Sequence, residues 1–320
     1  MRGGATGADA GRGRTRTATS GATRASIQNG RMVDGRVTRG TTGVNRLRRM
    51  DRFIAAHPAW RQAAVPHAVD LGYGASWWTA RELLVRLRTV RSDARVTGIE
   101  IEPARVRRAR EQAEAARAAG EPGLDGLQFV VGGFEVPLPG GERPAVIRAA
   151  NVLRQYDEAE VARAWDSMLA RLAPGGLLVE GTSNEVGRVA SWVSLRPETG
   201  PESFTIALSV DALGSGDVSG RGGVATEEVL PSIVAERLPK VLIHRNVAGE
   251  GVHELLRALD DQWVRAAPIG TFSARQRWIA AVRGLRDAGW PVRDGVARWR
   301  LGELTVDWSA VAPRSPRGSP

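Results

Sequence analysis

Cysteine is absent from this chain of 320 residues, which excludes disulfide bonds, thiolate nucleophiles, cysteine-ligated zinc and iron–sulfur clusters. Histidine is scarce, and the four histidines show no His-Glu-x-x-His spacing, so we expect no metal site. No apolar run approaches the ~20 residues needed to cross a bilayer. The basic N-terminus lacks the apolar stretch of a secretory signal. These absences predict a cytoplasmic protein without membrane contact.

Lysine is almost missing as well, because Lys240 is the only one and arginine supplies the remaining positive charge. The net charge of +10 is concentrated in residues 1–50, which hold 11 arginines and 2 aspartates, whereas the other 270 residues carry a net charge of +1. Residues 1–44 are rich in small and polar residues with few apolar anchors, which predicts a disordered basic tail. Such an arm can bind phosphate backbones without sequence preference, or can simply be a solvated extension.

Short apolar runs alternate with helix-forming stretches through the middle of the chain. This alternation predicts an α/β fold, in which a doubly wound, Rossmann-like, mostly parallel sheet of about seven strands carries helices on both faces. Later β-prone runs are expected to form an antiparallel edge. The parallel strands are predicted near residues 68–71, 96–101, 127–131, 146–152 and 177–182, and the antiparallel strands near 189–195 and 204–210.

A glycine-rich stretch in residues 211–223 marks a domain boundary, and mainly helical patterns follow it. The expected organisation is a tail over residues 1–44, a cofactor-binding domain over 45–215, a mainly helical C-terminal extension over 216–312 and a disordered tail over 313–320. Within the extension, residues 297–301 and 303–308 are predicted to pair as a hairpin.

The most informative motif is a strand that ends in Asp70 and runs into a Gly72-Tyr73-Gly74 turn. Glycine has no Cβ, so such a turn lets the backbone lie close to a ligand. A second apolar strand ends at Glu100, whose carboxylate can accept hydrogen bonds from both hydroxyls of a ribose. A dinucleotide site needs a glycine at the position held by Trp77, so a cofactor without a pyrophosphate is favoured.

At these residues the chain resembles the class I S-adenosylmethionine-dependent methyltransferases, and the likeness covers roughly residues 45–210. It continues in the family's order through residues 127–134, 147–153 and 172–179. The resemblance implies S-adenosyl-L-methionine as the cofactor. Ser76 stands where the family usually has a third glycine, and Gly133 stands where an acid commonly contacts the adenine amino group. The adenine would then be held by the backbone around Gly133 and Phe134, or by Glu135.

The resemblance therefore implies two sets of site residues. Cofactor binding is expected at the glycine turn, at the ends of the next two strands and at the residue after the fourth. The acceptor is expected to meet residues that follow the fourth and fifth strands. The cofactor set is Asp70, Gly72, Tyr73, Gly74, Glu100, Ile101, Gly133, Phe134 and Asn151; the acceptor set is Arg154, Gln155, Tyr156, Glu180, Arg188 and Trp192, with Asn184 and Glu185 beside them.

The leading hypothesis is an enzyme that transfers a methyl group by an SN2 step to an unidentified acceptor, with a small molecule favoured. Methyl transfer from a sulfonium depends mainly on in-line positioning, and the sequence identifies no general base. Two alternatives remain open. One is a catalytically silent binding module of the same fold. The other is an RNA methyltransferase or nucleic-acid binder that uses the arginine-rich tail.

Overall fold

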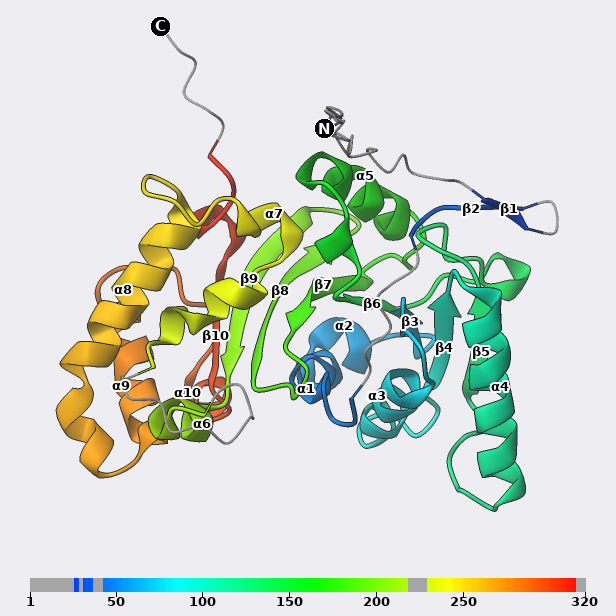
Figure 1. Ribbon diagram of the computed structural model, residues 1–320, viewed down its shortest axis with the longest axis horizontal. Helices are drawn as coiled ribbons and strands as arrows, with labels where there is room; N and C mark the ends of the chain where they lie inside the picture. Colours follow the sequence, from blue (N-terminus) through cyan, green and yellow to red (C-terminus); the bar gives the residue numbers. More distant parts are fainter. Residues whose placement is uncertain (1–25, 29–30, 37–42, 218–228, 315–320) are drawn as a thin grey trace, which may run out of the picture.

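A single mixed sheet with helices on both faces forms the body of the protein (Figure 1). The computed structural model describes residues 26–28, 31–36, 43–217 and 229–314. The sheet has eight strands, one more than expected, in the order β10-β9-β8-β7-β6-β3-β4-β5. The predicted α/β class is therefore confirmed, and the additional strand comes from the C-terminal extension.

Five parallel strands form one half of the sheet, and all five lie where the sequence predicts them. They are short, mostly apolar runs, and four of them are buried at every position or at all but one, as is usual for strands covered on both faces. The strand order reverses between β3 and β6, which opens a crevice at their carboxyl ends. The strands are β3 (His67–Leu71), β4 (Arg95–Glu100), β5 (Leu127–Val131), β6 (Val146–Ala150) and β7 (Leu177–Ser183).

Three antiparallel strands complete the sheet: β8 (Val189–Arg196), β9 (Gly200–Leu208) and β10 (Glu303–Asp307). The hairpin predicted within residues 297–308 is wrong. Val296–Trp299 instead forms the short helix α10, and β10 pairs with β9 across the sheet. The Trp299 indole is fully buried and donates to Asp294. These contacts stabilise residues 296–299 as a helical turn instead of a strand. One sheet thus joins the expected cofactor-binding domain to the C-terminal extension.

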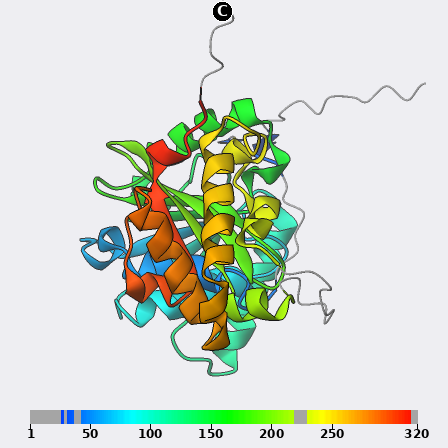
Figure 2. The same ribbon diagram turned by 90° about the vertical axis from the view of Figure 1, so that its left-hand side faces the viewer.

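Helices cover the two faces of the sheet with separate apolar cores. One core packs beneath the helices that precede and connect β3, β4 and β5, and the other lies beneath the helices that follow β6 and β9 (Figures 1 and 2). The first face carries α1 (Arg48–Ala56), α2 (Pro58–Arg61), α3 (Trp78–Arg88) and α4 (Pro103–Ala118). The second carries α5 (Glu158–Leu169), α6 (Val210–Ser215), α7 (Lys240–Ile243), α8 (Gly251–Arg265) and α9 (Ala274–Asp287).

Short 3₁₀ turns join several of these elements. They are η1 (Pro139–Gly141), η2 (Leu153–Gln155), η3 (Pro231–Arg237), η4 (Ala267–Thr271) and η5 (Trp308–Ala310). In the part of the chain that the structure describes, no helix has the length and apolar character to span a membrane.

The N-terminal region differs from the expected disordered tail where it is described. Strands β1 (Ser26–Gln28) and β2 (Arg31–Val33) pair antiparallel, and in Figure 1 they lie above β4 and β5. Residues 34–36 continue from β2 to the carboxyl edge of the sheet. The rest of the predicted tail over residues 1–25, much of the glycine-rich stretch, and residues 315–320 lie outside the described residues.

Candidate functional site

A pocket opens at the carboxyl ends of β3, β4 and β5, at the point where the strand order reverses. It encloses about 260 Å³, part of it open to solvent. Open α/β sheets bind ligands at this position. The pocket is lined by Leu71, Gly72, Glu100, Ile101, Gly132, Gly133, Phe134, Val152 and Tyr156, together with Asp34, Gly35 and Arg36. The pocket therefore brings together five of the predicted cofactor residues and one predicted acceptor residue.

The glycine turn has the backbone that only glycine adopts easily. Gly72 has φ 68° and Gly74 has φ 89°, and both values lie in the left-handed region. The Gly72 N–H donates to the Ile99 carbonyl at 2.7 Å, which ties the turn to β4. Because neither glycine has a side chain, a ligand can approach the backbone of the turn.

Glu100 connects the turn to the end of β4. Its side chain is buried, with one carboxylate oxygen accepting from Gly74 N–H and the other from Ile101 N–H, each at 3.0 Å. Burial raises the pKa of Glu100, while the guanidinium of Arg105 at 3.5 Å and the backbone N–H groups act in the opposite direction. A carboxylate has about four lone-pair positions, and the contact with Arg105, at the 3.5 Å limit, is the one that a ribose hydroxyl would most easily replace.

The loop after β5 offers a donor and an acceptor to Asp34, which lines the same pocket. Phe134 N–H donates to the Asp34 carbonyl at 2.9 Å. Glu135 folds back so that its carboxylate accepts from the N–H of Gly133 and from the N–H of Asp34, each at 3.0 Å. Val136 closes the loop with φ 44°, a strained value for a β-branched residue that costs about 1–3 kcal/mol. The surrounding contacts thus hold this loop in one shape.

Tyr156 and Phe134 line the pocket with two aromatic rings. The Tyr156 ring lies 5.4 Å from the Phe134 ring, and its hydroxyl accepts from Arg36 N–H. Burial raises the pKa of Tyr156 to about 12, despite the opposing Arg36 hydrogen bond and charge. Gln155, its neighbour, donates through Nε2 to the Arg36 carbonyl at 3.3 Å. The predicted acceptor residues Gln155 and Tyr156 thus lie beside the predicted cofactor residue Phe134.

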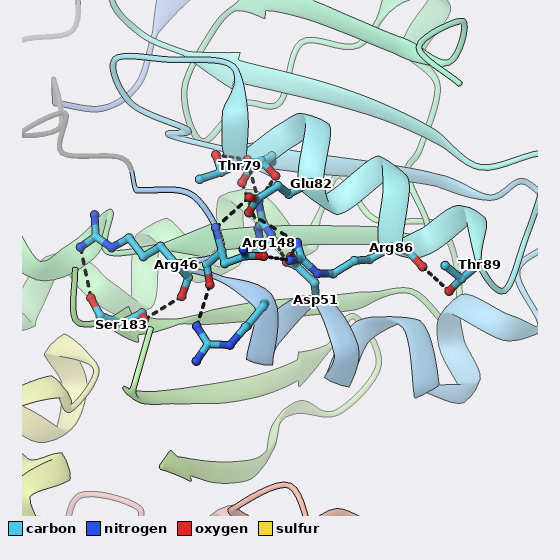
Figure 3. Close-up of polar contacts among 11 residues, drawn as sticks. Arg46, Asp51, Thr79, Glu82, Arg86, Thr89, Arg148 and Ser183 are labelled. Atoms are coloured by element: carbon cyan, nitrogen blue, oxygen red, sulfur yellow. Dashed lines mark hydrogen bonds and ion pairs between the residues drawn. The ribbon is translucent and has the colours of Figure 1, made fainter. Parts of the chain in front are cut away.

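Asp70 lies outside the pocket and takes part in a buried ion network beneath the turn. Arg148, fully buried in β6, pairs with Asp70 at 2.7 Å and also with Asp51 of α1. The Thr79 hydroxyl donates to Asp70 at 2.7 Å. Figure 3 shows Arg86 and Arg148 beside Asp51, with Arg86 paired to Asp51 at 2.8 Å. The network joins α1 and α3 to the two central strands. The Asp70 carboxylate is therefore bonded to protein groups on β6 and α3, directly before the turn.

Tyr73 and Asn151 point away from the pocket as well. The Tyr73 ring packs edge-on to Phe129 at 5.2 Å in the core beneath α3 and α4. Asn151 has φ 63°; its N–H donates to Gly181 and its Oδ1 accepts from Ser183 N–H at 3.0 Å. These two hydrogen bonds connect the residue after β6 to β7.

Three predicted acceptor residues are placed elsewhere. Glu180 is buried in the apolar core on the α5 side, where burial raises its pKa to about 8 against the opposing effect of the Trp165 indole. Trp192 is fully buried, with its ring 5.3 Å from Phe53. Arg188 pairs with Asp217 at 2.9 Å. Asn184 and Glu185 lie in the turn between β7 and β8, with the Asn184 side chain bonded to Arg188 N–H.

Arg154, in contrast, belongs to a cluster of three arginines beside the ends of β6 and β7. Arg46 donates to the Ser183 carbonyl at 3.1 Å, and Arg154 donates to the Glu236 carbonyl at 3.0 Å. Burial and the nearby charge of Arg237 lower the pKa of both side chains. The exposed carboxylates of Glu185 and Glu236 act in the opposite direction. This edge of the site therefore carries an excess of positive charge.

Several of these residues were missed by sequence reasoning. Residues 34–36 lie in a stretch whose composition indicates a tail, and no local signal places them against Gly133. Arg148 gives a clearer signal, because an arginine in the centre of an apolar strand must find buried counter-charges. Among the described ranges, no group of three or more histidine, aspartate or glutamate residues could hold a metal ion.

Comparison with known proteins gives fold-level likenesses only. No family model and no curated protein matches the chain. Among solved structures, the chain is similar to the O-methyltransferase NcsB1 from neocarzinostatin biosynthesis in complex with S-adenosyl-L-homocysteine and 1,4-dihydroxy-2-naphthoic acid, with 24% identity over 40% of this chain and 34% of that one, at a TM-score of 0.30.

Two further methyltransferases of known structure match a similar share of the chain. Human N-acetylserotonin methyltransferase, in complex with S-adenosylmethionine, is 20% identical over 41% of this chain and 33% of its own, at a TM-score of 0.30. The CcbJ methyltransferase from Streptomyces caelestis is 20% identical over 52% of this chain and 66% of its own, at a TM-score of 0.32. The chain thus spans about a third of NcsB1 and resembles methyltransferases of known structure over about half of its own length or less.

Proposed function

We propose that the protein is an S-adenosylmethionine-dependent methyltransferase. The observation that carries this proposal is the convergence of the Gly72–Gly74 turn, the buried Glu100 carboxylate and the Phe134 N–H on one pocket at the switch point of the sheet. These groups fit an adenosine. Glu100 can accept from the ribose hydroxyls, and the loop after β5 offers hydrogen-bonding groups to a purine edge.

The chain's own residues supply binding and orientation. When bound, S-adenosylmethionine supplies an activated methyl group with a neutral leaving group. The glycines at 72 and 74 leave room beside the turn, and the network around Arg148 holds that turn against α1 and α3. Phe134 and Tyr156 give the pocket an aromatic wall that excludes water from one side. In-line positioning of this kind is the main requirement of a methyl transfer.

For the acceptor, we propose a small molecule that carries an anionic group. Arg46, Arg154 and Arg237 lie beside the ends of β6 and β7, where an acceptor must approach. Arginine binds carboxylates and phosphates through several N–H groups at once. Release of S-adenosyl-L-homocysteine, followed over a panel of hydroxy- and amino-carboxylic acids and their neutral amides, tests this proposal. Turnover confined to the neutral amides contradicts it.

The cofactor assignment is tested by titration calorimetry with S-adenosylmethionine and S-adenosyl-L-homocysteine. Wild type is expected to bind both. Glu100→Gln is expected to bind about 10- to 100-fold more weakly, because hydrogen bonds to a charged group contribute about 1.5–3 kcal/mol. Glu114→Gln, on the exposed face of α4, serves as the matched control and should bind as wild type does.

Two results would change the assignment. Tighter binding of a reduced nicotinamide cofactor than of either sulfur compound would replace S-adenosylmethionine as the ligand. Tight binding without methyl transfer to any acceptor would favour a catalytically silent binding module with the same site.

A further inference from the structure

Residues 34–36, here called the strap, cross the pocket directly over the loop that follows β5. We propose that the strap occupies the adenine position in the ligand-free protein and competes with the cofactor for it. This inference rests on the proposed function, since it concerns the same pocket. It assigns to the N-terminal region an autoinhibitory role.

The hydrogen bonds of Asp34 resemble those of an adenine edge. Its carbonyl oxygen accepts from Phe134 N–H at 2.9 Å, and its N–H donates to the Glu135 carboxylate at 3.0 Å. The Watson–Crick edge of adenine offers the same pair, an amino donor beside a ring-nitrogen acceptor. One backbone residue thus satisfies both groups of the loop that an adenine would use. The strap and an adenine therefore cannot bind the Phe134 N–H and the Glu135 carboxylate at the same time.

The crossing depends on two glycines. A Cβ atom built at Gly133 would lie 1.8 Å from the Asp34 carbonyl oxygen, which no side chain can tolerate. Gly35 has φ +150°, and a Cβ there would lie 3.3 Å from the Tyr156 hydroxyl. The absence of a side chain at 133, where related enzymes commonly carry an acid, is therefore what lets the strap reach the floor of the pocket.

Arg36 anchors the strap on the acceptor side. Its guanidinium pairs with Glu160 at 3.1 Å, donates to the Gln155 carbonyl at 3.0 Å and lies 4.9 Å from the centre of the Tyr156 ring. Its backbone N–H donates to the Tyr156 hydroxyl. These contacts cover Gln155 and Tyr156 as well as the adenine position. Displacement of the strap would therefore expose both halves of the site at once.

The chain's lack of cysteine allows a direct test. Asp34 contacts the loop through its backbone, so Asp34→Cys keeps those hydrogen bonds and creates a unique thiol on the strap. Its rate of reaction with a chromogenic disulfide reagent is measured without ligand and with saturating S-adenosyl-L-homocysteine. We expect the bound ligand to raise the rate about tenfold or more. The control, Glu114→Cys on exposed α4, should react at one rate throughout. A rate at position 34 that is unchanged or lowered by bound ligand overturns the inference.

A second variant measures the competition as affinity. Arg36→Ala removes the anchor, so a larger fraction of the protein is open and the apparent Kd for S-adenosyl-L-homocysteine should fall about tenfold. Arg61→Ala, an exposed arginine on α2, is the matched control and should leave the Kd unchanged. If wild type and Arg36→Ala bind S-adenosyl-L-homocysteine with equal affinity, the inference about the strap is overturned and the proposed function is not. Failure of every variant to bind, Arg36→Ala included, overturns the proposed function and the strap with it.

Discussion

Arg148 and Asp70 lie opposite each other in register on β6 and β3, and their side chains form a fully buried ion pair at 2.7 Å. A second buried carboxylate, that of Asp51, reaches the same guanidinium from α1. A charged group that is buried away from water lowers the stability of the fold unless a group of opposite charge is bonded to it. The three charged groups therefore link α1 to β3 and β6, the strands on either side of the point where the strand order reverses.

Arg148→Met is expected to destabilise the protein by about 3–5 kcal/mol at pH 7, because it leaves Asp70 buried without a counter-charge and Asp51 with Arg86 alone. Urea denaturation measures the change. The loss should be smaller at pH 5, since burial raises the pKa of Asp51 to about 6 and that carboxyl can then be neutral. Arg108→Met, on the exposed face of α4, should change the stability little. A loss that is equal at both pH values would show that charge burial is not its cause.

Glu180 predicts a specific pH dependence of stability. Burial raises its folded-state pKa from 4.5 to about 8, so between these values the folded state keeps a proton that the unfolded chain releases. The free energy of unfolding therefore falls as the pH rises through this window, by up to about 1.4 kcal/mol per pH unit. Glu180→Gln cannot ionise and should lack this contribution. Urea denaturation of both proteins at several pH values from 5 to 8 gives the free energy of unfolding against pH. We expect this free energy to fall more steeply for wild type than for Glu180→Gln, and equal slopes would contradict the raised pKa of Glu180.

Tyr73 is expected to be replaceable by phenylalanine. Among the described residues its buried hydroxyl has no hydrogen-bond partner, so removing the oxygen costs no bond and relieves a desolvated polar group. Tyr73→Phe should leave the free energy of unfolding within about 0.5 kcal/mol of wild type, or raise it. Affinity for S-adenosyl-L-homocysteine, measured alongside, should not change. A marked loss of affinity would mean that the hydroxyl takes part in binding.

At Asn151, we expect a glycine variant to be more stable than an alanine variant. Its left-handed backbone favours glycine over alanine, whereas its Oδ1 bond to Ser183 is lost in both. Asn151→Gly is expected to cost about 1 kcal/mol, and Asn151→Ala about 1–2 kcal/mol more, because a Cβ is unfavourable at positive φ. Thermal and urea unfolding give the comparison. An alanine variant as stable as the glycine variant would contradict this account.

The parallel half of the sheet could be predicted from the sequence because its signals are local. Strands such as His67–Leu71 are apolar runs with a turn after them, and the Gly72 and Gly74 turn requires a conformation that few other residues adopt. Glu100 follows from the same logic, since its strand ends at the edge where the turn lies. Of these residues, Leu71, Gly72 and Glu100 line the pocket.

The remainder of the site depends on contacts between distant residues. Nothing near Asp34 indicates that it reaches Phe134, a hundred positions later, because the crossing is set by missing side chains at Gly35 and Gly133. Glu180 lies inside β7 and Trp192 inside β8, and both side chains are buried. A one-residue alternation decides which face of the sheet a strand residue meets. Composition and spacing carry no information about either choice.

The pairing of β10 with β9 limits how this chain can be divided. A fragment that ends near residue 216 would keep every predicted cofactor residue but would leave β9 as a bare strand edge, with Phe204 and Ile206 uncovered by the helices that follow. Unprotected edges of this kind recruit other chains and aggregate. Expression trials and minimal-domain engineering should therefore retain residues 229–314, which contribute β10 and the helices that cover β9.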